Sequence, residues 1–149
     1  MLFGEENRFI RETKMNHKSS RAHTILQVKL EIALPNGRLI RSNYDLCDLA
    51  GSERYNAPKL SKDHFDEMRS INLSLATLGK IINALSAKSR DPSKYVHIPY
   101  RESVLTRVLY GNFKAGTKSI VISAVSPTAK TIDESYATIR FAQNALNVK

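Results

Sequence analysis

Two short polar stretches hold the side chains that could carry out chemistry. The first, NHKSSRAH at residues 16–23, places two hydroxyls, an arginine and a histidine within eight residues. Such groups can bind a phosphate, a metal-bound water or a carboxylate. The second, DLAGSE at residues 48–53, supplies two carboxylates and a glycine, which the first stretch lacks.

The second stretch contains an Asp-x-x-Gly pattern, Asp48 to Gly51, directly after a run that predicts a strand. A carboxylate at the carboxyl end of a strand can hold a water bound to Mg²⁺, and the glycine N–H can approach a terminal phosphate. Alone, the pattern more often marks an ordinary strand-to-loop turn, and a stretch such as NHKSSRAH is more often a solvated loop. With Arg21 able to bridge to Glu53, the two stretches together indicate the two halves of a phosphate sensor.

A β-hairpin is expected to position both stretches. Apolar residues of one parity alternate with polar ones across residues 24–34, which predicts a strand buried on one face. Pro35-Asn36-Gly37 ends the run, and Asn-Gly favours a type I′ turn with positive φ at both central residues. Residues 38–47 then form the returning antiparallel strand, which ends at Asp48.

Helices are expected in the second half of the chain. From Asp63, the predicted N-cap, to about Ser86, apolar residues recur every three or four positions, which predicts a helix of about 36 Å at about 1.5 Å per residue. A shorter helix is expected from about Tyr100 to Tyr110. Capping-box spacing between Thr131 and Glu134 predicts a last helix over residues 135–146.

Two other segments complete the expected architecture. Residues 86–99 form a polar and basic connection with two prolines, and residues 118–127 are rich in β-branched side chains. The second pattern predicts a central strand covered on both faces. Strands alternating with helices indicate a layered α/β domain.

Composition limits the classes of protein. The chain has 149 residues, a formal net charge of +9 and a pI near 9.8, so we expect an acidic partner: nucleic acid, an anionic membrane face or an acidic protein. Cys47 is the one cysteine, which excludes an internal disulfide and favours a reducing compartment. No apolar run is long enough for a membrane span and no signal peptide is evident, so we expect a soluble intracellular chain.

The motifs resemble those of the kinesin motor domain. That family carries Asn-x-x-Ser-Ser-Arg-Ser-His as switch I and Asp-Leu-Ala-Gly-Ser-Glu as switch II; residues 16–23 match the first except at Ala22, and residues 48–53 match the second completely. SINLSLATLGKIINALS is similar to the relay helix, HIPYRESVLTRVL to the microtubule-facing loop and helix, and ISAVSPT with ESYATIRFA to the last core strand and helix. The resemblance implies a layered kinesin-type P-loop NTPase fold, of which this chain would form the carboxyl-terminal part of the central sheet with its flanking helices.

The resemblance also assigns roles near ATP and Mg²⁺. Ser20 would reach the Mg²⁺ and its water, Asp48 would hold the ion through a water, and the Gly51 N–H would sense the γ-phosphate. Arg21 and Glu53 would form an ion pair around the attacking water. The implied cofactor-binding residues are Ser19, Ser20, Asp48 and Gly51; the implied metal-binding residues are Ser20 and Asp48; the implied catalytic residues are Ser20, Arg21, Gly51 and Glu53.

A microtubule-facing surface follows from the same resemblance. The long helix would move with switch II, and Tyr100, Arg101 and Arg107 would face the track. Lysines and an arginine in the two connections that flank the long helix would attract the acidic surface of tubulin: Lys59, Lys62, Lys88, Arg90 and Lys94. The alternative for Arg101 and Arg107 is a solvated helix face or an internal ion pair.

The sequence departs from the family at several positions. Ala22 replaces a serine, Pro58 and Lys59 replace a Thr-Gly pair, and Leu73 stands where a lysine is usual. Val104 in place of lysine gives a weak hint of the kinesin-3 group. No Gly-x-x-x-x-Gly-Lys-[Ser/Thr] occurs, so we expect residues 1–149 to be a partial motor domain, from switch I to the last core helix, without the phosphate-binding loop and the amino-terminal half.

The sequence leaves three functional classes open. The first is a microtubule-based motor of the cytoplasm and cytoskeleton that couples ATP hydrolysis to microtubule binding and movement, with this piece alone expected to be inactive. The alternative is a kinesin-derived module that binds microtubules without hydrolysis. A nucleic-acid-binding domain is favoured only by charge, since aromatic residues are not interleaved with the basic ones, so no nucleic acid partner is expected.

Overall fold

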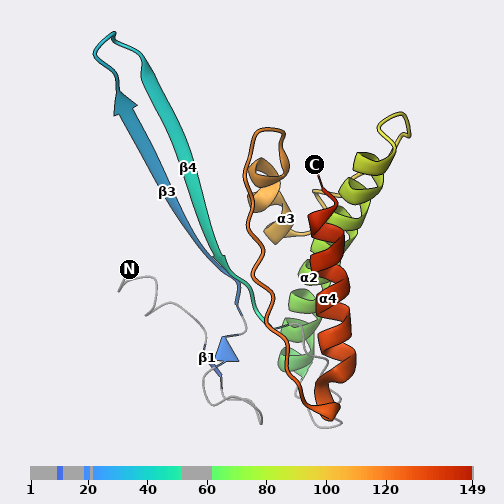
Figure 1. Ribbon diagram of the computed structural model, residues 1–149. Coiled ribbons are helices and arrows are strands. Elements are labelled where there is room, and N and C mark those ends of the chain that lie inside the picture. Colours follow the sequence, from blue (N-terminus) through green and yellow to red (C-terminus); the bar gives the residue numbers. More distant parts are fainter. Residues whose placement is uncertain (1–9, 12–18, 21, 52–61, 149) are drawn as a thin grey trace. The chain divides into compact units, whose positions relative to one another are not determined.

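The computed structural model describes residues 10–11, 19–20, 22–51 and 62–148, and the chain divides into two units, Met1–Gly51 and Ser52–Lys149 (Figure 1). The strands, all in the first unit, are β1 (Ile10–Arg11), β2 (Ser19–Ser20), β3 (Thr24–Ala33) and β4 (Leu39–Asp48). The helices, all in the second unit, are α2 (Lys62–Arg90), α3 (Val104–Val108), η1 (Leu109–Phe113), η2 (Ala129–Thr131) and α4 (Ile132–Leu146), where η denotes a 3₁₀-helix. No helix in these ranges is long and apolar enough to cross a membrane.

The predicted hairpin is confirmed. β3 and β4 pair in antiparallel register over their whole length, from Thr24 opposite Asp48 to Ala33 opposite Leu39. The alternation of the sequence places apolar pairs on one face, because residues directly opposite each other share a face of the ladder. These pairs are Leu26–Leu46, Val28–Tyr44 and Ile32–Ile40.

The expectation that this face is buried is wrong. Its apolar side chains are exposed, from 38% for Val28 to 63% for Leu46. In the described part of the first unit the other paired strands are β1 and β2, which have two residues each and form a separate sheet. A two-stranded ribbon cannot bury a face without a further layer packed on it.

The turn of the hairpin also differs from the predicted type I′. Leu34 N–H donates to Arg38 O at 2.8 Å and Gly37 N–H donates to Leu34 O at 3.0 Å, which leaves a three-residue loop. Gly37 has a φ of +79°, whereas no described non-glycine residue, Asn36 included, has a positive φ. Pro35 explains the change, since its fixed φ suits the second position of a type I turn, which the glycine then completes.

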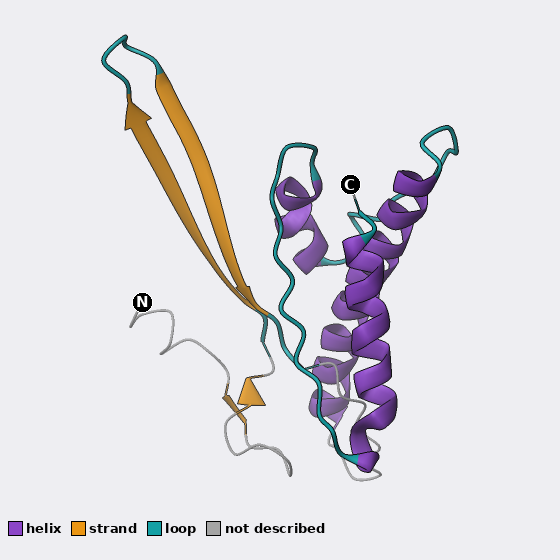
Figure 2. Ribbon diagram, in the orientation of Figure 1, coloured by secondary structure: helices purple, strands orange, loops and turns teal. Residues whose placement is uncertain are grey.

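The helical unit has a core of its own. α2 lies beside α4 and contacts α3 (Figures 1 and 2). The buried apolar side chains of this unit are Leu78, Ile81, Ile82, Leu105 and Leu109, and Thr77 and Thr106 are buried with them. At the surface, the Asn144 side-chain amide donates to Asn83 Oδ1 at 2.8 Å and joins α4 to α2.

The bounds of α2 correct two expectations. The helix begins at Lys62, so Asp63 lies in its first turn and is not the N-cap, and it continues four residues beyond Ser86 to Arg90. Pro92 explains the end, because a proline disfavours the helical conformation of the residue before it. The carboxylate of Asp91 then accepts bonds from the Ser93 N–H and hydroxyl at 3.2 and 2.6 Å, which closes the following turn.

The next helix starts later than expected. α3 begins at Val104 and not at Tyr100, and Ser103 is its N-cap, accepting a hydrogen bond from the Thr106 N–H at 3.1 Å. The hydroxyl of Thr106 donates to Tyr100 O at 2.9 Å. Residues 100–103 therefore form a hydrogen-bonded turn that leads into the helix.

The predicted central strand over residues 118–127 is wrong. These residues form no strand or helix (Figure 2), and Ile120 and Ile122 are 90% and 92% exposed. No strand lies in the described part of the second unit with which the segment could pair. The last helix is confirmed as α4, but the capping box is not: the Thr131 hydroxyl makes no cap and instead bonds that of Thr128 at 2.8 Å.

Candidate functional site

The two polar stretches meet at the open end of the hairpin. β4 ends at Asp48, directly opposite Thr24, which begins β3 immediately after the NHKSSRAH stretch. The backbone of Ser19 and Ser20 forms β2, with Ser20 opposite Ile10 and Ser19 opposite Arg11. The hairpin thus brings the end of the first stretch beside the start of the second, although about 25 residues separate them in sequence.

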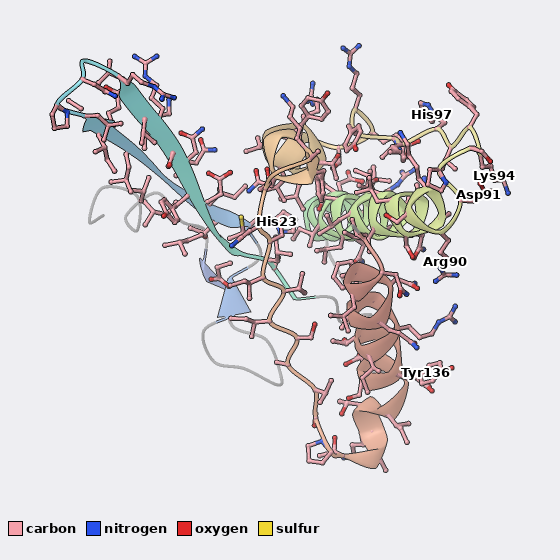
Figure 3. The ribbon with its side chains drawn as sticks, turned by 45° about the horizontal axis from the view of Figure 1, so that its top comes forward. His23, Arg90, Asp91, Lys94, His97 and Tyr136 are labelled. Atoms are coloured by element: carbon pink, nitrogen blue, oxygen red, sulfur yellow. The ribbon has the colours of Figure 1, made fainter. Side chains whose placement is uncertain are left out.

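A side chain joins the two stretches directly. The Ala50 N–H donates a hydrogen bond to His23 Nδ1 at 3.1 Å. His23, labelled in Figure 3, is half-buried, and this burial lowers the pKa of its imidazole below the usual value. This bond requires a neutral imidazole, since Nδ1 can accept a hydrogen bond only when the ring proton is on Nε2.

The phosphate-side residues are placed to different degrees. Asp48 lies at the carboxyl end of its strand, as predicted, and Gly51 is exposed directly after Ala50. Arg21 and Glu53 lie outside the described residues, so their ion pair stays a prediction. The roles assigned to Ser19, Ser20, Asp48 and Gly51 also stay predictions.

The donor chemistry fits Mg²⁺. A serine hydroxyl and a carboxylate are oxygen donors, which this ion prefers, and Mg²⁺ usually keeps several waters and takes only one or two protein ligands. Within the described ranges, no group of three or more histidine, cysteine or carboxylate side chains could hold a metal.

Basic side chains gather at the carboxyl-terminal end of α2. Lys88 and Arg90 are in its last turn and Lys94 is in the connection that follows; all three are exposed. Figure 3 shows Arg90, Asp91, Lys94 and His97 together at this end of the helix. Lys62 is the first residue of α2, and Lys59 lies outside the described residues.

Around α3, the structure separates the predicted residues into two kinds. Arg101 and Arg107 are exposed, and neither forms an ion pair with another residue of the described ranges. Tyr100 is half-buried. Its ring lies edge-on to the Tyr110 ring, with 4.9 Å between the ring centroids, and is tilted against the Phe113 ring, with 5.8 Å between the centroids. Burial, and to a lesser extent Tyr110, raises the pKa of the Tyr100 phenol.

Several residues that shape the site had no predicted role. Lys80 Nζ pairs with Glu102 at 2.8 Å and joins α2 to the turn before α3, and Lys114 Nζ lies 4.9 Å from the centroid of the Tyr110 ring.

His23 was part of a motif but had no assigned function. The available signal was its position at the last residue before a strand, where a side chain can reach the partner strand's continuation.

Comparison with known proteins identifies the family. Residues 1–148 match the family model described as "Kinesin motor domain". The kinesin-like protein KIN-14A of Oryza sativa subsp. japonica is 40% identical over 145 residues, which is 97% of this chain and 15% of that protein. The kinesin-like protein klp-20 of Caenorhabditis elegans is 38% identical over 149 residues, which is 100% of this chain and 22% of that protein. The chain therefore spans less than a quarter of these relatives.

Solved structures agree. A KIF14[391-772] dimer in a two-heads-bound state with AMP-PNP, in complex with a microtubule, superposes with a TM-score of 0.85 at 38% identity, covering 99% of this chain and 42% of that one. KIF14[391-755] with ADP, in complex with a microtubule, superposes with a TM-score of 0.79 at 38% identity over the same shares. The fold is thus that of a substantial part of a kinesin motor domain.

Proposed function

Because the chain belongs to the kinesin motor domain family, we propose that the protein containing it is a motor that couples ATP hydrolysis to microtubule binding and movement. Residues 1–149 supply the portion from switch I to the last core helix. The observation that carries the proposal is the His23–Ala50 hydrogen bond at 3.1 Å, which joins the two phosphate-side motifs at one end of the hairpin. A motif pair of this kind is useful when both halves must respond to the same phosphate.

The nucleotide side follows from the residue types. The Ser20 hydroxyl and, through a water, the Asp48 carboxylate would hold Mg²⁺, with Ser19 as a further nucleotide-binding residue; the ion would supply charge neutralisation on the phosphates. The Gly51 N–H would donate to the γ-phosphate, and the absence of a side chain would allow the close approach. Arg21 and Glu53 would form an ion pair that orients the attacking water, which is the positioning role that phosphoryl transfer chiefly needs.

The microtubule side uses the helical unit. Its exposed cations lie at the end of α2 and around α3: Lys88, Arg90, Lys94, Arg101 and Arg107. The formal charge of +9 matches an acidic track such as tubulin. The KIF14 structures in complex with a microtubule support this partner by similarity, and they support a location on the microtubule cytoskeleton.

Turnover and binding measured together test the proposal. The full-length protein should hydrolyse Mg-ATP faster with microtubules than without, and should cosediment with them less as salt rises. Cosedimentation without any turnover would instead favour the non-hydrolysing microtubule-binding module. Absence of cosedimentation at low salt would contradict both. The 149-residue chain, whose sequence contains no phosphate-binding loop motif, should show no significant turnover by itself.

A further inference from the structure

His23 is the side chain that connects β3 to the segment after β4. It is the residue immediately before β3, and Ala50 is the second residue after β4. The 3.1 Å bond between Ala50 N–H and His23 Nδ1 therefore extends the contact between the two strands beyond the last ladder pair, Thr24 with Asp48. It fixes a backbone amide whose segment has already left the sheet.

The burial of Ala50 makes this acceptor matter. Ala50 is only 5% exposed, so water cannot easily replace an acceptor that is lost. A buried backbone N–H without a partner destabilises the fold by its full desolvation cost. The backbone would therefore shift to bring the N–H to another acceptor. The Ala50–Gly51 peptide follows directly, so a rotation at Ala50 also redirects the Gly51 N–H.

We propose that His23 is a positioning residue: through its bond to Ala50 N–H it sets the backbone of residues 49–51 and thereby the direction of the Gly51 N–H toward a terminal phosphate. The part that concerns phosphate rests on the proposed function. The positioning itself rests only on the geometry at the end of the hairpin. His23 touches no reacting atom in this role, since it acts through the backbone of the second stretch.

Two substitutions separate the acceptor from the bulk of the side chain. In His23→Asn, Oδ1 stands two bonds from Cβ, as Nδ1 does in histidine, and can still accept from Ala50. In His23→Leu, a branched side chain remains but no acceptor does. His97→Leu is the matched control, because His97 is an exposed histidine of the helical unit (Figure 3) and lies outside the hairpin.

Amide exchange of single residues reads the result. The sequence has only two Leu-Ala bonds, Leu49–Ala50 and Leu75–Ala76, and only two Asp-Leu bonds, Asp45–Leu46 and Asp48–Leu49. In the 149-residue chain, carbonyl-¹³C leucine with ¹⁵N alanine selects the first two amides, and a second sample with carbonyl-¹³C aspartate and ¹⁵N leucine selects the other two. Ala50 reports on the proposed bond, Ala76 reports on α2, and Leu46, which faces Leu26 in a hydrogen-bonded pair of the ladder, reports on β4.

The expected pattern is specific. His23→Leu should speed exchange at Ala50 by about tenfold, the order expected for one lost hydrogen bond, while Leu46 and Ala76 keep their rates. His23→Asn should return Ala50 to within about threefold of the unsubstituted rate. His97→Leu should leave the Ala50, Leu46 and Ala76 amides unchanged. Unchanged exchange at Ala50 in His23→Leu would overturn the proposal, as would equal acceleration at Leu46, or a His23→Asn variant no better than His23→Leu.

A kinetic measurement then tests the phosphate part separately. In the full-length motor, His23→Leu should lower kcat for ATP hydrolysis by on the order of tenfold with a smaller change in KM, and His23→Asn should recover most of it. If the exchange pattern is as expected but kcat is unaffected, the bond positions the backbone without serving catalysis, and the phosphate part is wrong. If no variant and no unsubstituted protein turns over ATP, the proposed function fails while the exchange result still stands.

Discussion

The hairpin and the helical unit solve the problem of burying apolar surface differently. In the helical unit, α2, α3 and α4 cover one another, and Ile81 is 0% exposed. In the hairpin, one face is mostly apolar, yet Ile32 on that face is 52% exposed. The helical unit therefore contains its own stabilising core, whereas the hairpin is held by its backbone ladder, its turn and surface pairs such as Arg41 with Glu31 at 2.8 Å.

This contrast matters for function because the two units carry different proposed tasks. Of the residues proposed to face phosphate, Ser19, Ser20, Asp48 and Gly51 lie on the unit with little packing, whereas the basic surface lies on the unit with a core. Segments with few buried contacts open at low free-energy cost, so they can respond to a ligand. A packed helical unit can instead hold charged side chains in fixed positions on its surface.

The largest expected effect is a loss of ATP turnover on substitution of Glu53. Glu53→Ala in the full-length protein should lower ATP turnover by at least about 100-fold, since it would remove the group that we propose orients the attacking water. ATP affinity should stay nearly unchanged, because the proposed pair with Arg21 acts on the water and not on the base or ribose. Fluorescent-nucleotide binding beside a turnover assay checks this, and a loss of binding as severe as the loss of turnover would count against the assigned role.

A matched pair of isoleucines tests the difference in packing. Ile81→Ala should lower the free energy of unfolding of the helical unit by about 3 kcal/mol, because it leaves a cavity in the core. Ile32→Ala, at a largely exposed position of the hairpin, should cost less than about 1 kcal/mol. Urea unfolding followed by circular dichroism compares the two, with a helix wavelength for Ile81→Ala and a β-sheet wavelength for Ile32→Ala, and equal costs would mean that the hairpin face is covered in solution.

Substitutions on the basic surface should have the opposite pattern to Glu53→Ala, with microtubule affinity lowered and ATP turnover kept. Replacing both Arg101 and Arg107 with alanine should weaken microtubule affinity of the full-length motor by on the order of tenfold, and by less at high salt, because screening already reduces the attraction. Basal ATP turnover should change little. Cosedimentation at two salt concentrations is the measurement. Unchanged affinity would place the interface elsewhere, and a collapse of basal turnover would indicate a structural role for these arginines.

The smallest expected effect concerns Cys47 on the hairpin. Burial, and then the nearby Asp45 carboxylate, raises the pKa of its thiol above the ordinary value. Because the thiolate is the reactive form, alkylation at neutral pH should be slower than for a free cysteine, and the midpoint of its pH–rate profile should be higher. Asp45→Asn should move that midpoint down but not to the ordinary value, since burial is the larger cause. A midpoint that does not move would remove Asp45 as a cause.

Local patterns were read correctly from the sequence. The alternation in residues 24–34 predicted β3, the three- and four-residue spacing after Asp63 predicted α2, and the Asn-Gly pair predicted a turn. Each of these depends on residues that are near one another in the chain. Even the error in turn type was local, because Pro35 selects a type I geometry before Gly37 supplies the positive φ.

Features that depend on distant residues were not predicted. Residues 118–127 have the composition of a central strand, but strand formation needs a partner that composition does not specify. The His23–Ala50 bond spans 27 residues and follows only from the register of the hairpin. Likewise, nothing in the sequence around Thr106 indicates that its hydroxyl is buried against the Tyr100 carbonyl. The candidate site could therefore be located by motif, but its connections required the structure.

The length of α2 has a mechanical consequence. With 29 residues the helix is about 43 Å long at about 1.5 Å per residue. Treated as a rigid lever pivoting at its first turn, it would shift its far end by about 4 Å for a tilt of only about 5°. Arg90, at that far end, would move by about the distance between neighbouring Cα atoms of a chain. A small rotation where α2 begins would thus be enough to bring its cations into or out of register with fixed charges on a track.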